Sequence, residues 1–116
     1  MSSRLPKHLH DALMAATHAV TFLQGVDDSA YAGNLLVRSA VERQLEILGE
    51  ASRRALESDS SLRDRIPDLI LAIGLRNRII HGYDRIENEV VAETVRRDLP
   101  PLTERLKAEL LRFPLE

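Results

Sequence analysis

Apolar side chains recur at steps of three and four residues along nearly the whole chain, and this spacing is the strongest constraint on its fold. Between residues 5 and 26 the apolar positions are Leu5, Leu9, Ala12, Ala16, Ala19, Val20 and Leu23. Such a stripe covers one side of an amphipathic α-helix. Gly25 and the polar residues after it predict the end of this helix.

A second stripe predicts a longer helix over residues 29–56. Its apolar members are Val37, Val41, Leu45, Leu48, Ala51 and Ala55. The opposite side carries charged residues at steps of four, which is typical of a solvated face with paired charges. These are Arg38, Glu42, Glu46, Glu50 and Arg54. A di-metal site on the glutamates would need Glu-x-x-His partners, and the sequence contains none. We therefore expect a charged outer face.

A polar connection over residues 58–65 leads to a third predicted helix, with Pro67 in its first turn, where the missing N–H costs nothing. Gly82 suits a left-handed terminator for this helix. Its apolar residues form two sides. One side holds Ile66, Ile70 and Ile73, and the other holds Leu69, Ala72, Arg76, Ile79 and Ile80.

The C-terminal part keeps a helical stripe straight across two prolines. The stripe runs from Asn88 onward through Val91, Val95, Leu99, Leu102, Leu106 and Leu110. Because Pro100 and Pro101 cannot sit inside one regular helix, we expect a kink or two segments, with Asp98 capping the second. No segment alternates in the manner of a strand. The sequence thus predicts an all-α, antiparallel bundle of four to five amphipathic helices.

Composition excludes several classes of protein. Aromatic residues are 3% of the chain, with no tryptophan, so a platform that stacks nucleic-acid bases on rings is not expected. The absence of cysteine excludes disulfides and thiolate metal sites. The N-terminal residues include histidines and an aspartate where a signal peptide needs an apolar run, and no apolar span reaches membrane length. We therefore expect a cytoplasmic protein without membrane contact. His8 and His10 point roughly 200° apart on an ideal helix and cannot share a metal ion, so we expect surface histidines.

The stretch GLRNRIIHGYDR, residues 74–85, stands out because it combines an arginine, an asparagine, a histidine and a tyrosine within eight positions. When the chain is divided into residues 1–60, 61–85 and 86–116, only the middle part has a net positive charge. This part carries five arginines and three aspartates and includes the stretch. Arginines also outnumber lysines by 14 to two, and the planar guanidinium suits bidentate contact with phosphate. A solvated face explains the small charge excess equally well, and high genomic GC content explains the arginine bias.

Arg76 and His81 are a candidate catalytic pair, but a regular helix would place them about 140° apart and about 7.5 Å along its axis. Either the helix ends near Ile80, so that His81 can turn back, or a second copy of the chain brings the two groups together. Such a pair suffices for metal-independent RNA cleavage. The histidine handles the proton of the 2′-hydroxyl or of the leaving 5′-oxygen, and the arginine neutralises charge on the phosphate.

Spacing alone does not establish this chemistry, because Arg4 and His10 have the same spacing in a helix start to which we assign no function. The motif LRNRIIHGY, however, resembles the R-N-x-x-x-H-x-Y signature of HEPN-domain ribonuclease toxins of the HepT type. AVERQLEILGEASRR and DLPPLTERL resemble other parts of the same family, in the same order. The resemblance covers residues 35–110. This sequence has the family's residue at each of the four motif positions, which are Arg76, Asn77, His81 and Tyr83.

The resemblance implies that residues 1–116 form a single HEPN-like helical domain that acts as a homodimer, with two motifs lining a cleft at the interface. Arg76 and His81 would be the catalytic pair, and Asn77 would orient the phosphate or the histidine. The implied partners are an RNA substrate and a minimal nucleotidyltransferase antitoxin, with either the homodimer or a larger hetero-oligomer as the assembly. This antitoxin would neutralise the toxin by attaching AMP to Tyr83. No cofactor and no metal are expected.

Two alternatives to an enzyme remain at this point. One is a catalytically silent HEPN-like module that docks a nucleotidyltransferase. The other is a helical oligomerisation domain whose polar helix end is only a cap. Intact residues at all four motif positions favour the enzyme, since a silent module does not need them.

Overall fold

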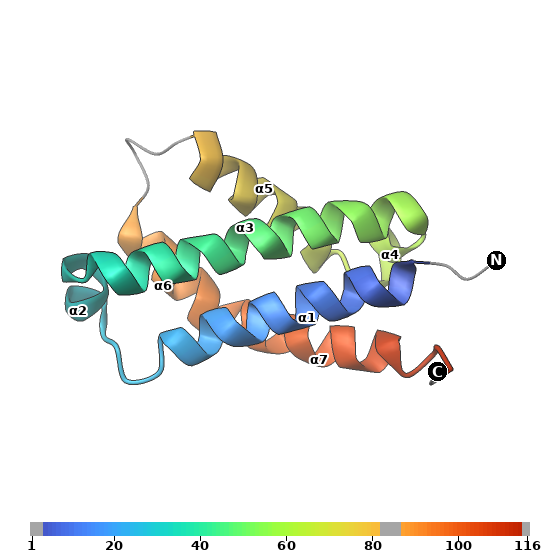
Figure 1. Cartoon of the computed structure of the whole chain (residues 1–116), viewed down its shortest axis with the longest axis horizontal. Coiled ribbons are helices and arrows are strands. Elements are labelled where there is room, and N and C mark those ends of the chain that lie inside the picture. Colours follow the sequence, from blue (N-terminus) through green and yellow to red (C-terminus); the bar gives the residue numbers. More distant parts are fainter. Residues whose placement is uncertain (1–3, 82–86, 115–116) are drawn as a thin grey trace.

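The computed structural model describes residues 4–81 and 87–114 except for the side chain of His81, and all regular structure in that part of the chain is α-helical. The longer helices are α1 (Leu5–Phe22), α3 (Leu35–Ser58), α5 (Asp68–His81), α6 (Asn88–Arg97) and α7 (Leu99–Leu110). Two short helices, α2 (Asp28–Gly33) and α4 (Leu62–Arg65), stand between them (Figure 1). The prediction of an all-α bundle is confirmed.

The first predicted helix forms and buries the predicted stripe. Leu9, Ala12 and Ala16 of α1 are fully buried, and each large aliphatic side chain removed from water contributes about 1.5–3 kcal/mol. The helix ends at Phe22, four residues before the predicted boundary. Gly25 has a φ of 73°, a left-handed conformation that glycine adopts without steric cost. Its role in ending the helix is thus confirmed.

The prediction of one continuous helix over residues 29–56 is wrong, because the helix is interrupted at Asn34. Two helices, α2 and α3, form in its place. Asn34 has extended backbone angles, and its side-chain Oδ1 accepts a hydrogen bond from the backbone N–H of Val37 at 3.1 Å. Asparagine side chains compete well for free N–H groups at a helix start. The apolar periodicity continues across the break, so periodicity alone could not reveal it.

Pro67 directly precedes α5, close to its predicted place in the first turn. Of the two predicted sides, the one with Leu69, Ala72 and Ile79 is buried, whereas Ile70 is exposed. The described helix ends at His81, within one residue of the end near Ile80 that one of the two alternatives requires. Gly82, the predicted terminator, lies outside the described residues.

The C-terminal stripe is divided into α6 and α7, which confirms the prediction of two segments at the prolines. Asp98 stands at the N-cap position of α7, but its side chain makes no capping hydrogen bond, so the predicted cap is wrong. Pro100 and Pro101 instead lie within the first turn of α7, where a missing N–H breaks no helical bond.

Helix α3 runs through the middle of the bundle and packs against α1 on one side and α5 on another (Figure 1). Helix α7 covers α1 from the far side. The fully buried leucines at their contacts include Leu9, Leu45, Leu102 and Leu106. Within the described ranges, no helix has the length and apolar character needed to cross a membrane. The packing leaves Ile70 and Leu71 of α5 exposed, and Arg76, Asn77 and the backbone of His81 belong to this helix.

Candidate functional site

Arg76 lies in the second half of α5, and its side chain is 29% exposed. Its Nη1 donates a hydrogen bond of 3.1 Å to Oδ1 of Asn77, the next residue in the chain. Neighbouring residues on a helix point in different directions, so the two side chains must bend toward each other over the surface. The structure therefore brings together the first two residues of the predicted motif.

The stem of Arg76 rests on Gly49, a buried glycine in the middle of α3. A Cβ atom at position 49 would lie 2.2 Å from Cβ of Arg76, 2.8 Å from its Cγ and 2.9 Å from its Cδ. No side chain fits in that space, so glycine is required for α3 and α5 to approach this closely. A glycine inside a helix costs about 1 kcal/mol relative to alanine. In return, the glycine lets the stem of Arg76 lie directly against the backbone of α3, which fixes the position of the stem.

Glu50, the residue after Gly49, faces the head of the same arginine. Its Oε1 lies 3.8 Å from Nη2 of Arg76. Arg53 donates two hydrogen bonds to this carboxylate, at 3.1 and 2.7 Å, and Arg54 donates a third at 3.0 Å. These hydrogen bonds lower the pKa of Glu50 to about 2.

Because Arg53 and Arg54 hold Glu50 more closely than Arg76 does, most of its charge is neutralised by those two arginines. Arg76 is thus oriented by a carboxylate but not locked to it. A guanidinium in this state can still bind a phosphate.

The other two predicted site residues are only partly covered by the structure. His81 is the last residue of α5, so its backbone is helical, while its side chain lies outside what is described. Tyr83 lies outside the described residues altogether. With a helix continuing through residue 81, ideal geometry keeps positions 76 and 81 about 140° apart.

The remaining histidines and the glutamate row differ in part from expectation. His18 is half-buried rather than on the surface, with Nδ1 3.4 Å from Oε1 of Gln44 and its ring stacked on Phe22. Burial raises the pKa of Glu42, so the row is not uniformly solvated. Glu46 pairs with Arg43, as a charged face predicts. Among the described residues, no group of histidine and carboxylate side chains is arranged to hold a metal ion.

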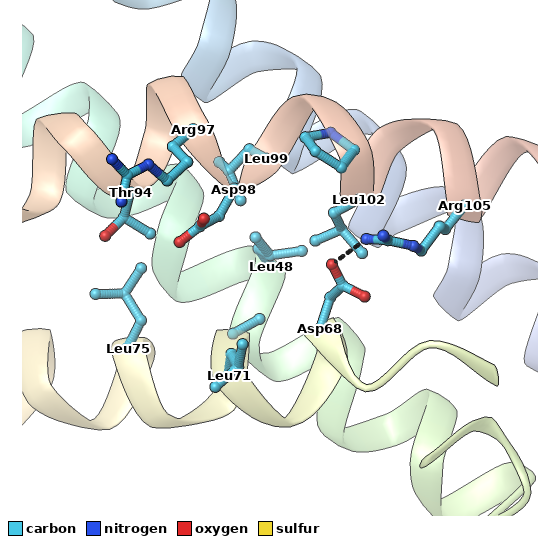
Figure 2. A pocket seen from close by; sticks show the side chains of 12 residues that line it. Leu48, Asp68, Leu71, Leu75, Thr94, Arg97, Asp98, Leu99, Leu102 and Arg105 are labelled. Carbon is cyan, nitrogen blue, oxygen red and sulfur yellow. Dashed lines mark hydrogen bonds and ion pairs between the residues drawn. The ribbon is translucent and has the colours of Figure 1, made fainter. Parts of the chain in front are cut away.

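An apolar groove of about 270 Å³ runs along the other flank of α5, between this helix and the junction of α6 with α7 (Figure 2). Leu71 and Leu75 of α5 form one wall, and Leu99 and Leu102 of α7 form the other. An ion pair of 2.6 Å between Asp68 and Arg105 crosses it, as the dashed line in Figure 2 shows. Leu71 is 71% exposed at its edge. An apolar side chain of another molecule could enter this groove.

These features define a helical bundle that holds an Arg-Asn pair of the HEPN type on one helix. Comparison with known proteins identifies the family. Residues 12–109 match the model of the ribonuclease HepT-like family, and the chain belongs to this family. No solved structure matches the chain significantly.

Two relatives illustrate the range of similarity. A protein of Methanocaldococcus jannaschii that is provisionally named RNase MJ1380 is 33% identical over 96 residues, which cover 81% of this chain and 85% of the relative. A protein of Thermococcus cleftensis provisionally named ribonuclease HepT is 38% identical over 63 residues, covering 54% of this chain and 56% of the relative.

Sequence reasoning missed the roles of Gly49 and Glu50. Glu50 was interpreted as part of a solvated face, although one of its oxygens faces Arg76. A signal was present, since a glycine in the middle of an otherwise strong helical pattern often marks a close approach of another element. That signal does not say which element approaches.

Proposed function

We propose that this protein is a metal-independent endoribonuclease. RNA would be cleaved by attack of a ribose 2′-oxygen on the adjacent phosphorus, which breaks the bond from phosphorus to the 5′-oxygen. The products are a 2′,3′-cyclic phosphate and a free 5′-hydroxyl. DNA lacks the attacking hydroxyl and would not be cut.

The proton leaves the 2′-hydroxyl as the new bond forms, and the 5′-oxygen gains a proton as the old bond breaks. His81 serves one or both of these transfers, because an imidazole titrates near neutral pH. Arg76 neutralises the charge that grows on the phosphate oxygens. Asn77 keeps the guanidinium turned outward through the hydrogen bond already described.

The observation that carries this proposal is that three neighbouring residues hold the side chain of Arg76 in place. The motif arginine has its stem fixed on Gly49 and its head between Asn77 and Glu50, and it remains partly exposed. An arginine that only keeps the surface soluble does not need these contacts. A guanidinium that must bind a phosphate in one geometry does need them, because a displacement of about 1 Å can cost about 10²-fold in rate.

The test is cleavage of RNA by purified protein in the presence of a chelator, with the ends of the products mapped. Arg76→Ala and His81→Ala should abolish cleavage and also abolish growth arrest on expression. Arg78→Ala is the matched control, since it removes the same charge from an exposed position on the same helix. Cleavage that persists unchanged in His81→Ala would overturn the proposal. A chain that never cleaves RNA would be the silent docking module.

We further propose that the enzyme is a cytoplasmic toxin controlled by a minimal nucleotidyltransferase antitoxin that transfers AMP from ATP to Tyr83. The phenol oxygen attacks the α-phosphate, pyrophosphate leaves, and the phenol proton passes to solvent. The attached phosphodiester would add a negative charge and a purine to the same motif that supplies Arg76, and both would oppose binding of the RNA phosphate. Support comes from the position of Tyr83 in the motif.

Intact-mass measurement after co-expression with the candidate antitoxin tests this control. The wild-type protein should gain the mass of AMP and lose RNA cleavage. Tyr83→Phe should gain no mass and stay active. Tyr31→Phe is the matched control, since Tyr31 is fully buried and should not affect the modification. An adduct that persists in Tyr83→Phe would refute the assignment.

We propose that the active form is a homodimer. On an ideal helix, positions 76 and 81 lie about 140° apart, and a second chain would bring the arginine of one copy to the histidine of the other. Ile70 and Leu71 are 41% and 71% exposed on the same helix, and Leu71 lines the groove in Figure 2. Apolar side chains exposed beside an apolar groove favour burial against a second copy.

A further inference from the structure

A second polar feature lies beside the candidate site, in a surface hollow between the start of α1 and the second half of α3. We call it the α1–α3 hollow. Its volume is about 160 Å³, and its charged and polar lining consists of Arg4, Lys7, His8, Asp11, Glu50 and Arg54. A cavity that holds one water needs only about 10–15 Å³ by this kind of measure, so the hollow has room for a group larger than a water.

The α1–α3 hollow is connected to the motif through one side chain. Glu50 lines the hollow and is also the carboxylate 3.8 Å from Nη2 of Arg76. Arg53 and Arg54 flank it along the exposed surface of α3 and are 43% and 54% exposed. Cationic side chains therefore continue from the motif across α3 to the start of α1.

The balance of charge along this surface is positive. Five cationic side chains surround three carboxylates. The cations are Arg4, Lys7, Arg53, Arg54 and Arg76, and the carboxylates are Asp11, Glu50 and Glu57, which pairs with Arg53. The pKa of His8 is lowered in this setting. Burial lowers it first, and the charges of Arg54, Lys7 and Arg4 lower it further against the opposing effect of Asp11.

We propose that the α1–α3 hollow binds a backbone phosphate of the single-stranded RNA that flanks the phosphate cleaved at Arg76. This inference rests on the proposed ribonuclease function and names how its substrate is held. The chain has few aromatic residues, so it lacks the ring surfaces on which other proteins stack single-stranded bases. Phosphate contacts must then supply most of the affinity, and one arginine at the motif is too few for a polymer substrate.

The hollow contains an ion pair whose two members should affect RNA affinity in opposite directions when each is neutralised. Lys7 and Asp11 form an exposed ion pair of 2.8 Å on α1. Lys107 and Glu104 form a comparable exposed pair of 3.3 Å on α7, which does not line the hollow. Neither ion pair includes Glu50 or Arg76. Substitutions in these pairs therefore leave the contacts of Arg76 with Gly49, Asn77 and Glu50 intact.

The experiment measures binding of a fluorescently labelled single-stranded RNA as a function of salt, in a His81→Ala background so that the RNA stays intact. At roughly 0.1 M salt, Lys7→Gln should weaken binding about fivefold and lower the salt slope by about 0.7, the value for one lost phosphate contact. Asp11→Asn should tighten binding by up to a similar factor. Lys107→Gln and Glu104→Gln should change neither quantity.

Damage to the fold cannot produce tighter binding, so the Asp11→Asn result separates a charge effect from a structural one. Equal affinities for Lys7→Gln, Asp11→Asn and the two α7 controls would overturn the inference. This would also be the outcome if the hollow served an acidic segment of a protein partner. Failure of the ribonuclease proposal is a separate result, because it is read from RNA cleavage and not from binding.

Discussion

Gly49 offers the sharpest test of how the fold positions the candidate site. Replacing it with alanine adds a methyl group 2.2 Å from Cβ of Arg76. That distance is far below van der Waals contact, and the Cβ of Arg76 cannot rotate away because it is bonded directly to the backbone. Helices α3 and α5 must therefore move apart, or Arg76 must move with its own backbone.

The expected size of the effect follows from two opposing contributions. Overpacking a tight contact costs about 1–3 kcal/mol. Alanine gains about 1 kcal/mol over glycine in the interior of a helix. We therefore expect Gly49→Ala to lower the free energy of unfolding by about 1 kcal/mol, which corresponds to roughly 4 °C in Tm for a chain of this size. RNA cleavage should fall by much more, since the arginine is displaced.

Gly74→Ala is the matched control, because Gly74 also lies inside a helix but a Cβ there meets nothing within 4 Å. This variant should gain about 1 kcal/mol. Thermal unfolding and cleavage are measured for both variants, with light scattering to confirm the same oligomeric state. If Gly49→Ala is as stable and as active as Gly74→Ala, the reasoning about the α3 and α5 contact is refuted.

Three further predictions concern charge and assembly. The pKa of Glu50 is lowered from 4.5 to about 2, so the stability it contributes is complete above about pH 4.5 and is lost as the pH falls toward 2. Glu50→Gln should flatten the acid limb of a denaturation series in that window, and an unchanged limb would contradict this. Glu109 is buried and accepts hydrogen bonds from Arg65 and Arg112, so Glu109→Gln should cost about 1–2 kcal/mol in urea unfolding, whereas exposed Glu104→Gln should cost less than about 0.5. Leu71→Arg should reduce the mass seen by light scattering from that of a dimer to that of a monomer, while Leu111→Arg, at a position that is 85% exposed at the end of α7, should not.

The amino-acid sequence by itself determined the helices, because their apolar stripes depend only on the period of an α-helix. It also determined the motif from Arg76 to Tyr83, since the motif is a local string of residue types. Local competition was harder to predict. Asn34 divides a continuous stripe, and Asp98 sits at a cap position without capping, because each outcome depends on hydrogen bonds that periodicity does not encode.

Only the tertiary structure decided what surrounds the motif. Glu50 is one of several similar glutamates on α3, and Gly49 is the one glycine of that helix. Which of them meets Arg76 depends on how α3 and α5 pack, that is, on contacts between residues far apart in the chain. The same holds for Arg4, whose spacing to His10 means nothing, but which the packing of α1 on α3 brings to a hollow beside the motif. Helix periods are local properties, whereas a binding surface is made by distant segments that only packing brings together.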